Sequence, residues 1–339
     1  MSRKSRTSAS EHGLISRVAD SCCWFGRYVE RSESTARELQ ATLHLALDGE
    51  LTAKQCWFPM IVIAGEEAPV RKRFGEVAFG DGELVQNYLV WEEECGSSLR
   101  RSIGAARENA RSIREVLSGE VWEAINELHL WIGGPEAQRD WEQQRDVFYR
   151  HVKQSSQLSL GLLRSTMLHD AVLDFIWLGM LVERIGQTAR LLDVHHHAFS
   201  AVASAHPVVE TAVWAALLRA FSGFEPFLKN FGPVTPDNVA TFLVFESRFP
   251  RSIAYCVGSA HDRLRALVAP DQEAGQLALK RLRGLDDWLR AIAAAPFETS
   301  SLHGLLTHVV DESAAIFESI GRELLGHTPP PQAVADVES

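Results

Sequence analysis

"CWFGRYVERSESTARELQ", residues 23–40, occurs a second time in the chain in the related form "IWLGMLVERIGQTARLLD", residues 176–193. At a constant shift of 153 residues, nine of the sixteen positions from Trp24 to Leu39 are identical. Background amino-acid usage would give roughly one identity over that length. Both copies carry a Glu-Arg pair among apolar residues at helical spacing. The repetition predicts two equivalent helices, each with a charged pair near its middle.

A second pair of segments supports a duplication. "YLVWEEECGSSLRRSIGAAREN", residues 88–109, aligns with "FLVFESRFPRSIAYCVGSAHDR", residues 242–263, at a shift of 154. A shift that changes by one residue over roughly seventy positions is typical of an internal repeat. We therefore expect an all-α protein in which two tandem helical repeats pack as a pseudo-two-fold helical bundle. The expected units are a disordered leader over 1–13, repeat one over 14–166, repeat two over 167–325 and a flexible tail over 326–339.

The hydrophobic period is helical almost throughout the chain. Long helices are expected over 13–48 and 167–197, and a single amphipathic helix over 136–163. Thr235, which is followed by proline, is a predicted N-cap with proline at the first helical position. The apolar run over 60–65 is ambiguous between strand and helix. Since no alternating strand pattern occurs elsewhere, the sequence favours an entirely helical fold.

Composition narrows the classes of function. The chain has 339 residues, a net charge of −10 and no concentrated basic stripe, which argues against binding to nucleic acid. No apolar run reaches the length needed to span a membrane, so no membrane association is expected. The five cysteines form no Cys-x-x-Cys pair, which favours reduced thiols and a cytoplasmic protein.

Common metal-binding and catalytic motifs are missing from the sequence. There is no Glu-x-x-His, which the di-iron helical bundles require. His195, His196 and His197 are consecutive, so they point to different faces of a helix and cannot all bind one metal. The glycine-rich segment over 74–83 lacks the lysine of a phosphate-binding loop. We therefore expect no metal and no resident cofactor.

The Glu-Arg pairs are the candidate functional residues. Trp24, Tyr28 and Arg31 share one face of the first copy, while Glu30 and Arg37 lie on a neighbouring face. The second copy repeats this arrangement, so packing the two helices together would bring both pairs near a common axis. The candidate catalytic residues are Glu30, Arg31, Glu183 and Arg184, and the candidate substrate-binding residues are Trp24, Arg27, Tyr28, Arg37, Trp177 and Arg190.

Two interpretations of these pairs stay open. In the first, buried ion pairs fix the register of two helices and contribute little net stability. In the second, the arginines bind a carboxylate or phosphate in bidentate fashion, and the glutamates orient the arginines or accept a proton. Only the second interpretation makes the pairs a ligand site.

Three segments resemble the signatures of the Alpha-E family, a bacterial all-helical domain named for its Glu-Arg motif. They are "LISRVADSCCWFGRYVERSESTARELQ" over 14–40 and the segments over 105–131 and 242–253, and the resemblance extends over 14–325. It implies genomic association with circularly permuted ATP-grasp ligases, transglutaminase-like proteins and proteasome-like peptidases. A role with such a ligase in forming or modifying an amide or peptide bond is then expected, with ATP used by the partner. The alternative is a non-catalytic helical scaffold for partner proteins.

The second copy departs from the family pattern. The Gly-Arg-Tyr that precedes Glu-Arg in the family is present as Gly26-Arg27-Tyr28, whereas the second copy reads Gly179-Met180-Leu181. His169 stands where the family usually has an arginine. If the family site uses those basic side chains, its second half is altered in this chain. The resemblance carries over no catalytic mechanism.

Overall fold

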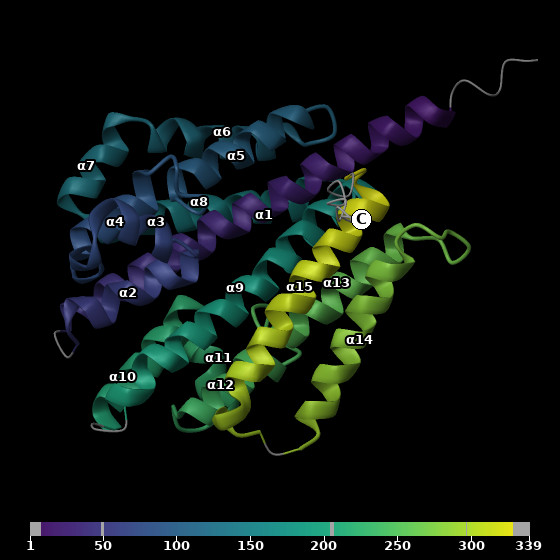
Figure 1. Cartoon of the computed structure of the whole chain (residues 1–339). Coiled ribbons are helices and arrows are strands. Elements are labelled where there is room, and N and C mark those ends of the chain that lie inside the picture. Colours follow the sequence, from purple (N-terminus) through teal and green to yellow (C-terminus); the bar gives the residue numbers. More distant parts are fainter. Residues whose placement is uncertain (1–7, 49–50, 204–206, 296, 328–339) are drawn as a thin grey trace, which may run out of the picture.

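A computed structural model describes residues 8–48, 51–203, 207–295 and 297–327. Within these residues every regular element is a helix, so the all-α prediction is confirmed (Figure 1). Two short 3-10 helices, over Glu76–Gly80 and Thr299–Ser301, accompany the α-helices. The first eight α-helices are α1 (Ser8–Leu47), α2 (Ala53–Ala64), α3 (Glu67–Phe74), α4 (Gly82–Trp91), α5 (Leu99–Ser112), α6 (Gly119–Ile132), α7 (Pro135–Gln143) and α8 (Arg145–Thr166). The remaining ones are α9 (Ala171–Ala203), α10 (Pro207–Ala220), α11 (Phe224–Asn230), α12 (Pro236–Phe245), α13 (Ile253–Leu267), α14 (Gln276–Ala293) and α15 (Leu302–Leu324).

The two helices that carry the repeated motif, α1 and α9, pack against each other at the centre of the molecule. A Cβ atom on Gly26 would overlap the carbonyl oxygen of Ile176, and a Cβ atom on Gly179 would overlap that of Cys23. These two contacts are reciprocal at the shift of 153 found in the sequence. Both positions require glycine because the backbones approach closely there. Contacts on either side of this crossing advance together along both helices, from Cys23 with Phe175 to Glu30 with Arg184, so α1 and α9 run in the same direction.

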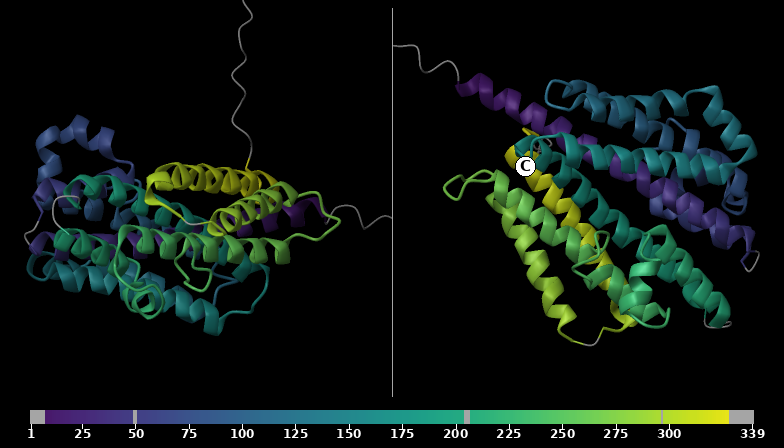
Figure 2. Two further views of the ribbon diagram at one scale, coloured as in Figure 1. Left: turned by 90° about the horizontal axis from the view of Figure 1, so that it is seen from below. Right: turned by 180° about the vertical axis from the view of Figure 1, so that it is seen from behind.

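The other helices surround this central pair. In the view of Figure 1, α4 to α8 gather above α1, and α10 to α15 lie below it. Helices α5 and α8 pack on α1, whereas α13 and α15 pack on α9. Figure 2 shows α15, in yellow, lying along this second group. The Glu-Arg motifs are therefore enclosed by helices from both parts of the chain.

The turns before α5 and α13 are built in the same way. Ser98 caps α5 by accepting from the backbone N–H of Arg101, and Ser252 caps α13 by accepting from that of Tyr255. Asp81 and Thr235 cap the preceding helices, α4 and α12. Each pair of caps is related by the shift of 154 seen in the sequence. The division into two repeats with the boundaries given above stays a prediction.

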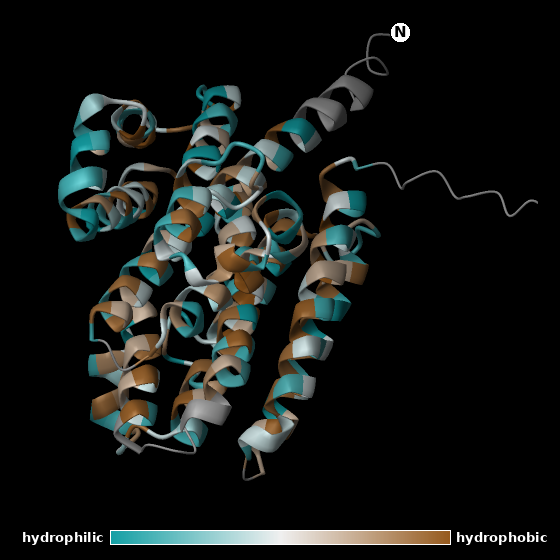
Figure 3. Ribbon diagram, turned by 60° about the vertical axis from the view of Figure 1, so that its left-hand side comes forward, coloured by the Kyte–Doolittle hydropathy of each residue, from teal (hydrophilic) through white to brown (hydrophobic). Residues whose placement is uncertain are grey.

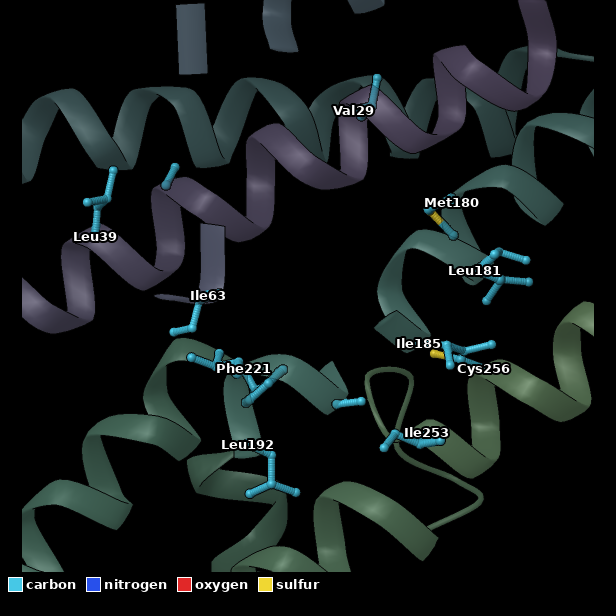
Figure 4. Close-up of a cluster of buried hydrophobic side chains, with 14 of the residues drawn as sticks. Val29, Leu39, Ile63, Met180, Leu181, Ile185, Leu192, Phe221, Ile253 and Cys256 are labelled. Carbon is cyan, nitrogen blue, oxygen red and sulfur yellow. The ribbon is translucent and has the colours of Figure 1, made fainter. Parts of the chain in front are cut away.

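The core is a single cluster of buried apolar side chains contributed by nearly all helices. Figure 3 shows the apolar residues, in brown, on the inward faces of the helices. Figure 4 shows part of the cluster, where Ile185 of α9 lies beside Cys256 of α13. Among the described residues, no helix is both long and apolar enough to cross a membrane.

Two sequence-based boundaries differ from the structure. The segment over 136–163 is not one helix, because Gln144 leaves helical geometry with φ −149° and ψ 67°. This break lets α7 fold back, so that Trp141 meets Phe148 and Tyr149 edge-on. The ambiguous run over 60–65 is helical up to Ala64, the last residue of α2, and Gly65 follows in the left-handed conformation that terminates helices.

The expected terminal segments are described only in part. Helix α1 begins at Ser8, so residues 8–13 of the expected leader are helical, and residues 1–7 lie outside the described part of the chain. At the other end, His327 contacts Asp20 through its Nε2 atom at 2.8 Å. Residues 328–339 of the expected tail lie outside the described residues.

Candidate functional site

The two Glu-Arg pairs exchange partners across the contact between α1 and α9. Arg184 donates from Nε to Oε1 of Glu30 at 2.9 Å and from Nη2 to Oε2 of the same carboxylate. Arg31 donates from Nε to Oε1 of Glu183 at 2.8 Å. Each glutamate is thus bound by the arginine of the other helix. The structure brings together the four residues that the sequence placed near a common axis.

Glu30 belongs to a sealed group of charges, which we call the Glu30 cluster. Besides Arg184, it includes Glu33 and Arg37 of α1, and Arg251 from the turn before α13. Arg251 donates to Glu30 at 3.1 Å and to Glu33 at 2.7 Å. Arg37 donates to Glu33 at 3.0 and 2.7 Å. Both glutamate side chains are 0% exposed. With two carboxylates bound by three guanidinium groups, this cluster has little capacity left for a ligand.

The charges in the Glu30 cluster hold its carboxylates ionised. Burial by itself raises the pKa of Glu33, but Arg251 and Arg37 outweigh it and lower that pKa to about 2. The pKa of Glu30 is also lowered, since Arg184 and Arg251 offset its burial. Neither group is suited to accept a proton near neutral pH. The Glu30 cluster therefore matches the structural interpretation of a buried ion-pair group.

Glu183, in contrast, lies in the wall of a cavity of about 370 Å³, which we call the Glu183 cavity. It is bounded by α1, α9, the end of α2 and the turn before α5. Its apolar wall includes Met60, Ile63 and Leu89. The polar residues that line it are Arg31, Thr35, Glu38, Glu66, Ser97, Glu183, Gln187 and Arg190. Of the four central Glu and Arg residues, Arg31 and Glu183 therefore face open space.

Glu183 is held in place by three side chains. Arg27 donates to its Oε2 atom at 2.9 Å, while Arg31 and Gln187 donate to Oε1 at 2.8 and 3.2 Å. Burial raises the pKa of Glu183, but Arg31 and Arg27 lower it to about 2. Such a carboxylate stays ionised and orients the arginines instead of accepting a proton. Arg27 thereby supplies the second guanidinium that Arg251 supplies to Glu30.

Two arginines of the Glu183 cavity have unused donors. The Arg190 guanidinium makes no hydrogen bond to any described residue, and its terminal nitrogens lie close to the backbone of Gly186. Burial lowers the pKa of Arg190, with Glu183 as the largest opposing charge. Arg31 uses only its Nε within the described part of the chain, which leaves both terminal nitrogens available. Donors of this kind, at the edge of a cavity, are suited to an anion.

Glu38 is a functional candidate that the sequence interpretation missed. It is buried, lines the cavity and has a pKa raised to about 8 by burial, which Arg190 and Arg251 only partly offset. A carboxyl group with this pKa exchanges protons near neutral pH, as general acids and bases do. The sequence did contain a signal for Glu38, because its helical spacing from Arg31 and Thr35 places it on the same face of α1.

The predicted aromatic residues lie beside the cavity and do not line it. Trp24 stacks on Tyr28 with ring centroids 5.4 Å apart. The Arg27 guanidinium lies 4.6 Å from the Trp24 ring and 3.9 Å from that of Phe317. Trp177 is half-buried against the core. This aromatic group supports Arg27, which in turn binds Glu183, so the contact with the cavity is indirect.

Other residues of the site come from loops that the motif does not contain. Glu66 follows α2 and accepts from Tyr88 Oη at 2.8 Å and from the backbone N–H of Gly96 at 3.2 Å. Ser97 and Arg251 lie in the turns before α5 and α13. No periodic pattern in the sequence connects these positions with the motif helices. Their place at the site follows only from the tertiary packing.

A group of potential metal ligands lies apart from the Glu183 cavity. Asp193, His197 and His303 offer atoms within 4.8 Å of one another, although both histidines are exposed. His303 already contacts the Asp193 carboxylate from Nδ1 at 2.9 Å. Only one of the three consecutive histidines belongs to this group. As expected from the sequence, the side chains of His195, His196 and His197 do not all point toward one position.

Comparison with known proteins gives one result. No curated protein and no solved structure matches the chain. The Alpha-E family, described as a predicted alpha-helical domain with a conserved ER motif, matches residues 14–325. The Glu and Arg of that motif are present here in two copies whose side chains bind each other across α1 and α9. The chain therefore belongs to the Alpha-E family.

Proposed function

We propose that the protein binds an anionic ligand in the Glu183 cavity and acts with an ATP-grasp-type ligase in forming or modifying an amide or peptide bond. The observation that supports the ligand site is the pair of arginines with unused donors, Arg31 and Arg190, in the wall of one cavity. Structural ion pairs alone do not account for these donors. The ligase partnership is what membership of the family implies.

The division of labour follows from ATP-grasp chemistry. The ligase activates a carboxylate as an acyl phosphate, and an amine then displaces the phosphate. A helical partner with free guanidinium groups is suited to hold a carboxylate or phosphate group during this exchange. Transglutaminase-like proteins and peptidases of the same genomic neighbourhood are further proposed partners. In this proposal ATP is bound by the ligase, and the chain itself carries no cofactor.

The alternative proposal is a non-catalytic scaffold. It is favoured by the Glu30 cluster, in which every carboxylate oxygen is already bound by an arginine and both glutamates are fully buried. A scaffold would use both Glu-Arg pairs only to fix α1 against α9. It would leave the donors of Arg190 without a role.

One experiment separates the two proposals. The protein is mixed with the ATP-grasp ligase of its genomic neighbourhood, ATP and amino acids, and amide products are measured by mass spectrometry. We expect product to depend on the chain, and Arg31→Lys to fold normally but lose this effect, because lysine cannot reproduce the planar donor pair. Arg322→Gln, a change on the exposed side of α15, serves as the control. Equal product without the chain, together with no detectable binding, would refute the ligase proposal.

A further inference from the structure

The Glu30 cluster and the Glu183 cavity occupy equivalent places but contain different side chains. At the shifts found in the sequence, Arg184 corresponds to Arg31, and Arg37 corresponds to Arg190. Two other positions are not matched in this way. Where one site has Glu33, the other has Gly186. The change of residue type removes a carboxylate from the side that contains the cavity.

The second unmatched position is in the turns before α5 and α13. Arg251 there corresponds to Ser97. The equivalence is geometric, because the residue that follows each of them is the serine that caps the next helix. Arg251 contacts Glu30, and Ser97 lines the same cavity as Glu183. The change from arginine to serine removes a guanidinium from the side that contains the cavity.

The two missing groups are neighbours. In the Glu30 cluster, Arg251 donates from Nη2 to Oε2 of Glu33 at 2.7 Å. Arg27 binds Glu183 through Oε2, but at Oε1 no described side chain takes the place of Arg251, so this side of the cavity lacks a cation and a carboxylate that would stand side by side. Arg37, which binds the Glu33 carboxylate, has its counterpart in Arg190, whose guanidinium has no hydrogen bond among the described residues. The cavity of about 370 Å³ is much larger than the space of a single water molecule.

We propose that the Glu183 cavity binds a free α-amino acid, whose carboxylate and ammonium groups take the places of the missing carboxylate and guanidinium. The carboxylate would be bound by Arg190 and Arg31, and the ammonium by Glu183. On an α-amino acid these two groups share one carbon, so they are adjacent as the missing pair is. This inference rests on the proposed anion site and adds the requirement for a cation.

The remaining walls agree with such a ligand. Met60, Ile63 and Leu89 provide an apolar surface for a side chain. Glu66 adds a second acidic group on the side of α2. A simple phosphate would use only the arginines and would leave Oε1 of Glu183 without the additional cationic donor that Arg251 supplies to Oε1 of Glu30. The combination of two arginines, an ionised glutamate and an apolar wall fits a zwitterion better than an anion alone.

The ligand test uses the purified full-length protein and the common protein amino acids, each at millimolar concentration. Thermal shift identifies those that bind, and calorimetry compares the tightest one with its N-acetyl derivative and its amide. We expect each derivative to bind at least about tenfold more weakly, because each lacks one of the two charged groups. If the N-acetyl derivative binds equally well, the anion site stands and the amino-acid inference fails. If no amino acid and no derivative binds, both fail.

The second test uses a variant that restores, in the Glu183 cavity, the closed arrangement of the Glu30 cluster. Gly186→Glu restores the missing carboxylate next to Arg190, and a new Cβ there would meet the Arg190 terminal nitrogens at 3.3 and 3.5 Å, which a flexible side chain can relieve. We expect this variant to bind the amino acid at least about tenfold more weakly and to melt at the same or a higher temperature. Gly161→Glu, at an open position on α8, is the matched control. Unchanged affinity in a folded Gly186→Glu protein would overturn the inference.

Discussion

Among single residues, the neighbours of each Glu-Arg pair decide whether the pair is sealed or faces open space. Glu30 and Glu183 have the same partner in sequence, yet one lies in a sealed cluster and the other faces a cavity. Arg251 accounts for this difference on the Glu30 side, because it fills the space and adds a second guanidinium. On the other side Arg27 supplies that charge from the opposite direction. The two copies of one motif therefore have different surroundings.

Removal of Arg184 and removal of Arg190 should lower stability to very different extents. Arg184→Ala leaves the Glu30 carboxylate buried with only part of its neutralising charge, so we expect the free energy of unfolding to fall by about 3–5 kcal/mol. Arg190→Ala removes a side chain without hydrogen bonds to described residues, and the loss should stay below about 1 kcal/mol. Urea denaturation of both variants measures the difference. Equal losses would show that Arg190 is a structural residue.

The stability of the protein should depend on pH through Glu38. Burial raises its folded-state pKa from 4.5 to about 8, so the folded protein retains a proton that the unfolded chain releases between these values. Over this window Glu38 lowers the free energy of unfolding as pH rises, by at most about 1.4 kcal/mol per pH unit. Glu38→Gln removes this effect, and its gain in melting temperature over the wild type should grow from pH 4.5 to 8 and then level off.

The exposed Glu318 provides the control for this measurement. Glu318→Gln should give a difference in melting temperature that changes little over the same pH range. If the difference for Glu38→Gln is likewise independent of pH, Glu38 does not titrate in the folded protein as its burial requires.

At the scale of elements, the close contact between α1 and α9 depends on two glycines. The sequence marked both positions as identical, and the structure gives the reason, since each backbone lies against a carbonyl group of the other helix. The lengths of the long helices followed largely from local pattern. The break between α7 and α8 did not, because it arises from the packing of Trp141 on α8 and not from a glycine or proline.

Substitution of either central glycine should separate the two helices. Gly26→Ala and Gly179→Ala each place a methyl group onto a backbone carbonyl, which cannot move aside as a flexible side chain does. We expect each change to lower the free energy of unfolding by more than about 2 kcal/mol, as overpacking of a rigid contact does. Gly161→Ala, at an open helical position, should instead stabilise the protein slightly. Thermal melting of the three variants tests this, and tolerance of alanine at Gly26 would contradict the packing.

At the scale of the whole molecule, the two predicted repeats depend on each other. Each glutamate of the motif finds its arginine on the other central helix, and both helices bury apolar surface at their contact. A unit cut at the predicted boundary would expose that surface and leave both charged groups without their partners. The predicted units are thus halves of one core.

Expression of residues 14–166 and 167–325 as separate chains tests this dependence. We expect each half alone to be largely unfolded or aggregated, since it would expose the inner face of α1 or α9. Produced together, the two halves should assemble into a helical complex. Circular dichroism and size-exclusion chromatography measure the outcome. Two independently folded halves would show that the repeats are separate domains.

The helical class, the family, the equivalence of α1 and α9, and the approach of the four Glu and Arg side chains could all be predicted from the sequence. These follow from local periodicity and from a repeat that can be counted along the chain. Only the tertiary structure decided that the Glu30 side is sealed while the Glu183 side is open, and that Glu38 and Glu66 belong to the site. A cavity forms where the packed side chains are too small to fill the space between helices, and local sequence patterns do not show where that happens. On the Glu183 side Ser97 is such a side chain, because it stands where the longer Arg251 fills the Glu30 side.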